Sequence, residues 1–232
     1  MRTQMTAADD DADAPGLYQI GGLSAIALGV GYVVIVALYV SVGAPPNDGE
    51  AWLRYLSDKT AVWWAILGLS VLTDFLFLPV TFALFGALKG ISRNAMRLSA
   101  TLMGLFVVLD LAVTWSNYAS LLTLSDRYAA ATTDVQRAGY IAAANYAAAL
   151  LASRLFVVYA IVVLSSSIFI IGLVMLKGVF SRTTAYLALI TGVLGIVSLA
   201  GWGVTIILNA AFATVWIFFV GFRLCRLAWR PS

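Results

Sequence analysis

The chain has 232 residues, of which 62% are hydrophobic and 11% charged, and its mean hydropathy is +0.96. A soluble domain cannot bury so much apolar surface, so the composition excludes a water-soluble globular protein and predicts several membrane spans in one domain. The net charge of +3 is accounted for by basic residues beside the spans, and no nucleic-acid-binding module accompanies it.

The residue types restrict the chemistry further. The sequence has no histidine and one cysteine, Cys225, which removes intrachain disulfides and the commonest metal ligand and general base. Intramembrane aspartyl proteases use two aspartates on adjacent spans, but Thr73-Asp74 and Leu109-Asp110 lack their Tyr-Asp and Gly-x-Gly-Asp motifs. We therefore expect no catalytic residues, no cofactor and no metal, and a membrane enzyme is only the third functional hypothesis.

The segment before the first apolar run is acidic, with Asp9, Asp10, Asp11 and Asp13. A cleavable signal peptide would be basic there, so none is predicted. Residues 1–15 are expected to form a disordered acidic cytoplasmic tail, and residues 16–230 a single six-helix transmembrane domain.

Six apolar runs follow, each near the roughly 20 residues that a helix needs to cross a bilayer. They cover residues 17–42, 61–88, 98–124, 155–176, 184–200 and 204–222. Only Gly201-Trp202-Gly203 separates the last two, and an uninterrupted helix there would be about 60 Å long, so a tight turn is predicted. The expected fold is an all-α, polytopic transmembrane helix bundle.

Two segments between the spans have helical patterns of their own. Residues 48–59 follow Ala44-Pro45-Pro46 and place Trp52, Leu53 and Leu56 on one side, which predicts a short amphipathic helix. Residues 133–153 are rich in alanine and show no obvious helix breaker. They are predicted either to extend the fourth span outward or to lie on the membrane surface.

The basic residues predict the orientation. With six spans, nine of the fourteen Lys and Arg residues fall on one side: Arg2, Lys89, Arg93, Arg97, Lys177, Arg182, Arg223, Arg226 and Arg230. The other side holds Arg54, Lys59, Arg127, Arg137 and Arg154. The positive-inside rule then places both termini in the cytoplasm.

Asp74 and Asp110 lie deep inside the second and third apolar runs. Ionisable groups in the membrane interior are costly and usually functional. Asp74 is 15 residues from Lys89 and Asp110 is 13 from Arg97, which places them about 22 and 20 Å from the basic ends of their helices. Adjacent antiparallel helices would bring the two carboxyl groups together, and like charges that close would leave at least one protonated.

Polar residues at helical spacing accompany the aspartates. Ser70 and Thr81 share a stripe with Asp74, while Thr114 and Asn117 share one with Asp110. Asn209 lies at a similar depth, about 21 Å from Arg223, so one polar cluster at mid-depth is predicted.

Arg154 is the obvious candidate counter-ion. It lies 23 residues from Lys177, about 34 Å along the helix, which places it near the outer interface. It is expected to extend toward water rather than reach Asp110, and Asn117 is its nearer partner by depth.

Two functional hypotheses follow. In the first, the protein binds or moves a small solute, ion or lipid through the mid-depth cluster, and any active transport is coupled to ions. The candidate ligand- or ion-binding residues are Asp74, Asp110, Asn117, Asn209, Thr114, Ser70 and Arg154. In the second, the protein is a structural or accessory membrane subunit whose aspartates only hold helices together. The expected partners are the lipid bilayer and a small solute or cation, without nucleic acid, and a homo-oligomer or a larger membrane complex stays open.

Three phrases resemble a family of bacterial integral membrane proteins. They are Gly21-Gly22 at the first span, FALFGALKGISRN at 82–94, and WIFFVGFRLCRL at 216–227. The chain is similar in these phrases to the family called domain of unknown function 4386, over nearly its whole length. The resemblance implies an uncharacterised six-helix protein of the bacterial cytoplasmic (inner) membrane, with no assigned activity or site residues.

Overall fold

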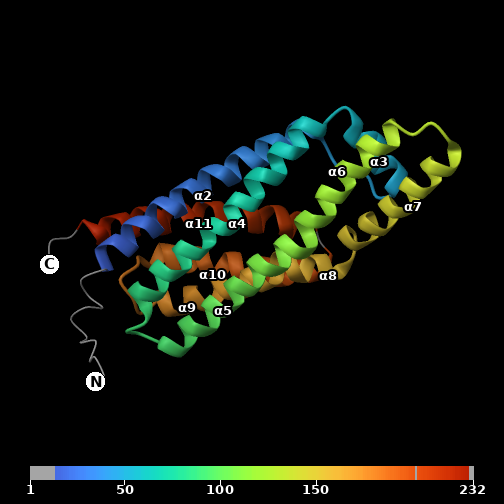
Figure 1. Cartoon of the computed structure of the whole chain (residues 1–232). Helices are drawn as coiled ribbons and strands as arrows, with labels where there is room; N and C mark the ends of the chain where they lie inside the picture. The colour runs from blue at the N-terminus through green and yellow to red at the C-terminus, as the bar shows by residue number, and fades with distance from the viewer. Residues whose placement is uncertain (1–13, 202, 230–232) are drawn as a thin grey trace, which may run out of the picture.

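A computed structural model describes residues 14–201 and 203–229, and within these ranges all regular structure is helical (Figure 1). The predicted tail falls almost wholly outside the described residues, as do Arg2, Trp202 and Arg230. The helices in chain order are α2 (Ala14–Val42), α3 (Gly49–Ser57), α4 (Thr60–Leu88), α5 (Arg93–Leu109), η1 (Asp110–Trp115), α6 (Ser116–Ala129), α7 (Asp134–Leu151), α8 (Arg154–Val157), η2 (Val158–Val162), α9 (Val163–Met175), α10 (Arg182–Val197), η3 (Ser198–Ala200) and α11 (Gly203–Ala228).

Six helical runs are long and apolar enough to cross a membrane, which confirms the predicted all-α fold with six spans. Their bounds differ from the predicted ones by a few residues. The largest differences are in the third run, which covers Arg93–Ala129, and in α11, which continues to Ala228. The 37 residues of the third run would extend about 55 Å as an ideal helix, beyond the roughly 30 Å of hydrocarbon.

The six runs form a closed ring. Going around it, α2 packs on α4, α4 on α5, α5 on α9, α9 on α10, α10 on α11, and α11 on α2. The start of α2 and the end of α11 therefore lie at the same end of the bundle (Figure 1). Which side of the membrane this end faces stays a prediction from the basic residues.

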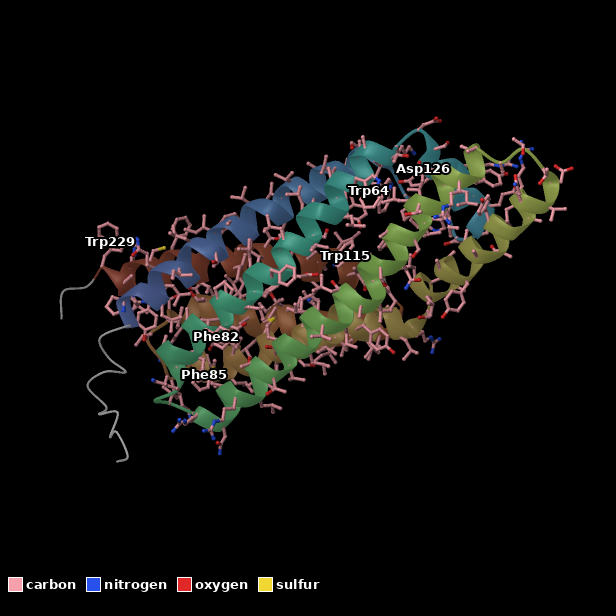
Figure 2. The ribbon with its side chains drawn as sticks, viewed as in Figure 1. Trp64, Phe82, Phe85, Trp115, Asp126 and Trp229 are labelled. Atoms are coloured by element: carbon pink, nitrogen blue, oxygen red, sulfur yellow. The ribbon has the colours of Figure 1, made fainter. Side chains whose placement is uncertain are left out.

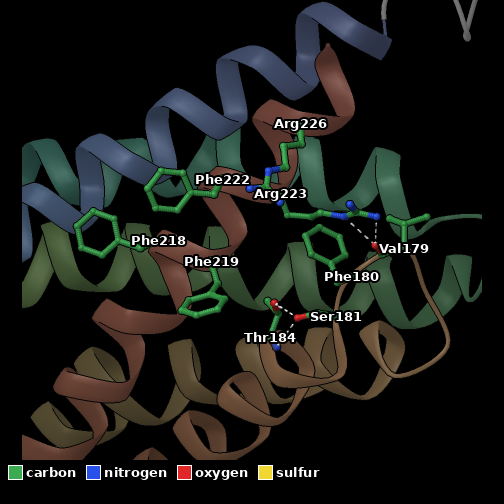
Figure 3. A pocket seen from close by; sticks show the side chains of 9 residues that line it. All are labelled: Val179, Phe180, Ser181, Thr184, Phe218, Phe219, Phe222, Arg223 and Arg226. Atoms are coloured by element: carbon green, nitrogen blue, oxygen red, sulfur yellow. Dashed lines mark hydrogen bonds between the residues drawn. The ribbon is translucent and has the colours of Figure 1, made fainter. Parts of the chain in front are cut away.

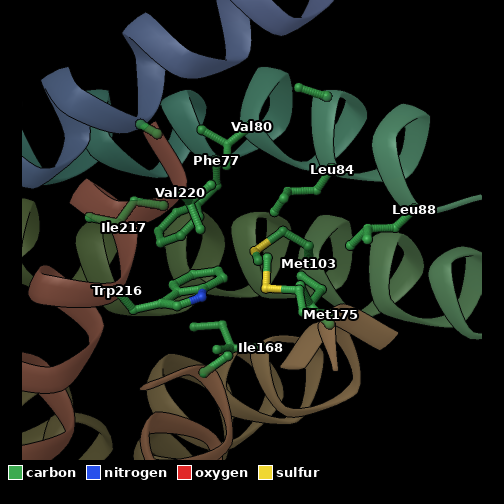
Figure 4. Close-up of a cluster of buried hydrophobic side chains, with 14 of the residues drawn as sticks. Phe77, Val80, Leu84, Leu88, Met103, Ile168, Met175, Trp216, Ile217 and Val220 are labelled. Carbon is green, nitrogen blue, oxygen red and sulfur yellow. The ribbon is translucent and has the colours of Figure 1, made fainter. Parts of the chain in front are cut away.

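The inside of the ring is filled with apolar side chains from all six runs (Figure 4). This cluster, which we call the ring core, includes Leu28, Phe77, Met103, Ile168 and Trp216. Glycines bring the helices close together: a Cβ at Gly22 of α2 would lie 2.6 Å from Cys225 Sγ of α11. Gly22 thus fits the first span against the last one, whereas Gly21 fits it against Pro79 and Ala83 of α4.

A second apolar cluster lies at the opposite end, where α3 and α7 pack against α6 (Figure 1). We call it the cap core, and it contains Trp52, Leu53, Leu56, Trp63 and Leu121 among others. The short amphipathic helix is confirmed as α3, with its three predicted apolar residues buried. Its first turn is fixed by the side chain of Asp48, which accepts a hydrogen bond from the Ala51 amide at 2.9 Å.

The expectation that residues 133–153 continue into the fourth span without a break is wrong. α7 ends at Leu151, and α8 begins at Arg154. The Ser153 side chain caps α8 by accepting a hydrogen bond from the Phe156 amide, so the chain can turn at Ala152 and Ser153. α7 is therefore a separate helix, packed on α3 and α6 as a wall of the cap core.

Candidate functional site

The two aspartates lie at the boundary between the ring core and the cap core. On α4, Asp74 lies between Ile66 of the cap core and Phe77 of the ring core. On the third run, Asp110 follows Phe106 of the ring core and precedes Leu121 of the cap core. Both carboxyl groups are buried, with exposed fractions of 3% for Asp74 and 4% for Asp110, so they face the protein interior rather than lipid.

The carboxyl groups of Asp74 and Asp110 lie near each other, within the range of electrostatic interaction. The structure thus brings together the two residues whose depths match. Tyr32 of α2 lies near both carboxyl groups. Neither carboxyl forms an ion pair with a Lys or Arg in the described ranges, where the ion pair present joins Arg54 and Glu50 on α3.

A turn of π-helix, η1, begins at Asp110 itself. In an α-helix, the residue five positions after Asp110 would point roughly 140° away from it around the helix axis. In a π-helix, the wider turn places that residue directly above Asp110. Trp115 is that residue, and its Nε1 donates a hydrogen bond to Asp74 Oδ2 at 2.8 Å. Trp115 projects toward α4 (Figure 2). The sequence alone does not single out Trp115, because no residue pattern marks a π turn.

Thr114 lies beside Asp110, one residue before Trp115. Asp110 Oδ1 and the Thr114 hydroxyl are both buried, yet neither makes a hydrogen bond of normal geometry with the described residues. Buried polar atoms usually have partners, and the same lack is seen at Trp63 Nε1, Thr191 Oγ1 and Trp216 Nε1 among the described residues. We call Asp74, Asp110, Thr114, Trp115 and Tyr32 the acid site.

Stacked aromatic rings connect the acid site to the cap core. The Trp115 ring lies 5.6 Å from Tyr118, which stacks on Trp63 at 5.4 Å between centroids. Trp63 in turn contacts Tyr39, Trp52 and Tyr55. We call the set Tyr39, Trp52, Tyr55, Trp63 and Tyr118 the aromatic column.

The column ends at the bundle surface near the start of α4. There the Tyr55 hydroxyl donates to the carbonyl groups of Gly43, at 3.0 Å, and Val42. Partial burial raises the pKa of Tyr55, so this hydroxyl keeps its proton at neutral pH. Lys59 Nζ lies 3.8 Å from the centre of the Tyr55 ring and donates to the Val42 carbonyl, which places a cation over the end of the column.

The other predicted residues do not all join the acid site. Ser70 is buried one turn before Asp74, and its carbonyl accepts from the Thr73 hydroxyl. Asn117 instead donates to the Val113 carbonyl of its own helix and lines a separate outer groove with Ser120, Arg127 and Tyr146. Arg154 is exposed at the start of α8.

Asn209 makes its hydrogen bonds in a second polar group, on other helices than those of Asp74 and Asp110. Its Nδ2 donates to the Thr191 carbonyl at 2.7 Å and to Ser165 Oγ at 3.2 Å. These contacts join α9, α10 and α11, which lie across the ring from the helices of the acid site. Because Asn209 has no described contact with either carboxyl, it fastens helices rather than serving the aspartates.

Replacing Trp115 with phenylalanine tests the bond to Asp74. The ring contact with Tyr118 is kept while the donor is lost, so we expect the free energy of unfolding to fall by about 1–2 kcal/mol. The measurement is SDS-induced unfolding of the purified protein. Trp64→Phe is the control, because Trp64 is 43% exposed on α4 and should unfold as the unmodified protein does (Figure 2). Equal stability of the two variants would contradict the assigned hydrogen bond.

The fold and the buried carboxyls define a multi-pass membrane protein whose helices suit a lipid bilayer. In comparison with known proteins, no family model, no curated protein and no solved structure matches the chain.

Proposed function

We propose that this protein takes up and releases a proton or a small monovalent cation at the acid site, and uses it to move a small solute across the bacterial inner membrane. The observation that supports this most strongly is the proximity of Asp74 and Asp110 at mid-span, without a basic partner in the described part of the chain. In a region of low dielectric constant, two adjacent carboxyls cannot both be ionised without a counter-charge, so they either hold a proton between them or share a cation.

The ligand set favours a singly charged ion over a divalent metal. Ca²⁺ takes six to eight oxygen ligands, and Mg²⁺ needs near-octahedral geometry. The described residues contain no group of three or more potential acidic, histidine or cysteine ligands. Two carboxyls and the Thr114 hydroxyl fall short of the ligand number of Ca²⁺ and do not form an octahedral cage for Mg²⁺, but they suffice for a proton.

The aromatic column supports access of the proton or cation to the acid site from the end of the bundle that carries α3. The hydroxyl groups of Tyr39 and Tyr118 lie next to each other between the acid site and that surface. Tyrosine hydroxyls both donate and accept hydrogen bonds, and aromatic faces attract cations.

The experiment is a flux assay on the full chain reconstituted in lipid vesicles. A membrane potential is imposed, and the internal pH or Na⁺ content is followed with a dye. We expect flux above that of empty vesicles, and Asp74→Asn or Asp110→Asn to lower it at least tenfold, because asparagine keeps the shape and hydrogen bonding but cannot titrate. Asp126→Asn, at an exposed acid of α6, should leave the flux unchanged (Figure 2).

Folded asparagine variants that retain full flux would overturn the proposal. Absence of flux in the unmodified protein, with asparagine variants stable and alanine variants unfolded, would establish the structural alternative, in which the aspartates hold α4 against η1.

We also propose that the chain is related to the family called domain of unknown function 4386. The three phrases of the sequence that resemble this family support the proposal.

A further inference from the structure

A groove opens at the end of the bundle where α2 starts and α11 ends, far from the acid site along the helices. Its volume is about 670 Å³. One face of α11, the loop after α9 and the first turn of α10 form its walls (Figure 3). The side chains that line the groove include Phe218, Phe219, Phe222, Arg223, Arg226 and Thr184.

The groove is apolar at one end and basic at the other. Phe218 and Arg226 are eight residues apart on α11, a distance of about 12 Å along the helix. The arginines lie near the end of this span, and the phenylalanines lie one to two turns closer to its middle. Since spans end where headgroups begin, the basic end of the groove is expected at the headgroup level and the phenylalanines in the hydrocarbon. Phe219 and Phe222 are 44% and 58% exposed, so the groove is open toward the hydrocarbon.

The positive charge in the groove is not neutralised by acidic groups in the described part of the chain. Arg223 donates to the Val179 carbonyl through Nε at 2.8 Å and through a terminal nitrogen at 2.5 Å (Figure 3). A guanidinium has five N–H groups, so this contact holds it in place and leaves donors for a ligand. Arg226 is exposed, and neither arginine forms an ion pair in the described ranges.

We propose that this groove binds one anionic phospholipid, with its phosphate at Arg223 and Arg226 and an acyl chain along the phenylalanines. Guanidinium groups bind phosphate oxygens through paired hydrogen bonds, and basic pockets between membrane helices bind anionic headgroups. A free phosphate would contact only the basic end of the groove. A phospholipid would contact both ends, because its phosphate would lie at the arginines and its acyl chain beside the phenylalanines. The inference is independent of the acid site and of its ion.

The test measures lipid retention by native mass spectrometry. The full chain is purified in detergent and supplied with phosphatidylglycerol or with phosphatidylcholine of the same chain length. We expect selective retention of one phosphatidylglycerol, and Arg226→Gln to weaken its binding about fivefold, the effect typical of one basic residue at an anionic lipid surface. Arg226→Lys keeps the charge and should retain most of the binding. Phe222→Ala should also weaken it, because the acyl chain loses a contact.

Arg97→Gln is the matched control, since Arg97 is exposed on α5 at the same end of the bundle but outside the groove. It should bind the lipid as the unmodified protein does. Equal retention of the two lipids, equal retention by Arg226→Gln and the unmodified protein, or complete displacement by millimolar inorganic phosphate would each overturn the proposal. Arg226 makes no described contact that holds the fold, so its loss leaves the protein folded for the measurement.

Discussion

Replacing Trp63 with alanine lowers the free energy of unfolding by about 3–5 kcal/mol, the cost of removing a large aromatic side chain from a core. Trp63 is 1% exposed and is the centre of the aromatic column, in contact with Tyr39, Trp52, Tyr55 and Tyr118. Its loss leaves a cavity that none of these rings can fill without breaking its own contacts. The measurement is reversible unfolding in SDS, followed by the fluorescence of the remaining tryptophans.

The neighbouring residue provides the control for this prediction. Trp64 has the same side chain on the same helix but is 43% exposed toward lipid (Figure 2). Trp64→Ala should change the stability by less than about 1 kcal/mol, because acyl chains can occupy the vacated space. A similar loss in both variants would mean that the aromatic column does not hold α3 and α4 together.

Gly195→Ala is the second substitution with a large expected effect. A Cβ at Gly195 would overlap the Ser165 side chain and come within 2.9 Å of Asn209 Nδ2. The polar junction of α9, α10 and α11 must then separate, and we expect a loss of about 1–3 kcal/mol despite the better helix propensity of alanine. Thermal unfolding of the protein in detergent measures this loss of stability.

Two further variants make this prediction specific. Gly104→Ala lies inside α5, where an added Cβ meets nothing within 4 Å, so stability should stay equal or rise. Ser165→Gly removes the atoms that overlap the new methyl group, and it should restore part of the stability in the double variant with Gly195→Ala. Absence of that recovery would contradict the assigned clash.

The sequence predicted the architecture well because the bilayer imposes it. Runs of about 20 apolar residues must be helices in lipid, and their lengths gave the six spans to within a few residues at most ends. α3 was predictable for a related reason, since Asp48 caps it and its apolar residues recur at helical spacing. The common depth of Asp74 and Asp110 also followed from counting residues along two adjacent helices.

The site was predicted less completely, because its geometry depends on a local change of helix type. An α-helical repeat places Asn117 on the stripe of Asp110, but the π turn changes the register from Trp115 onward and brings the indole to Asp74 instead. Asn209 was predicted to join the aspartates from its depth alone. Depth does not determine which neighbouring helix a side chain faces, and Asn209 faces Thr191 of α10. The break at Ser153 did have a signal, since serine is a favoured N-cap, but the surrounding alanines hid it.

The closed ring has a consequence for how the protein is made. Its first and last spans, α2 and α11, are neighbours that fit through Gly22 and Gly221, so the seam between them forms only after the final helix has entered the membrane. Until then the nascent chain exposes the glycine-lined face of α2 and the unpaired side of α10 to lipid. Closure of the ring is therefore a long-range event in folding, because it joins α2 (Ala14–Val42) to α11 (Gly203–Ala228).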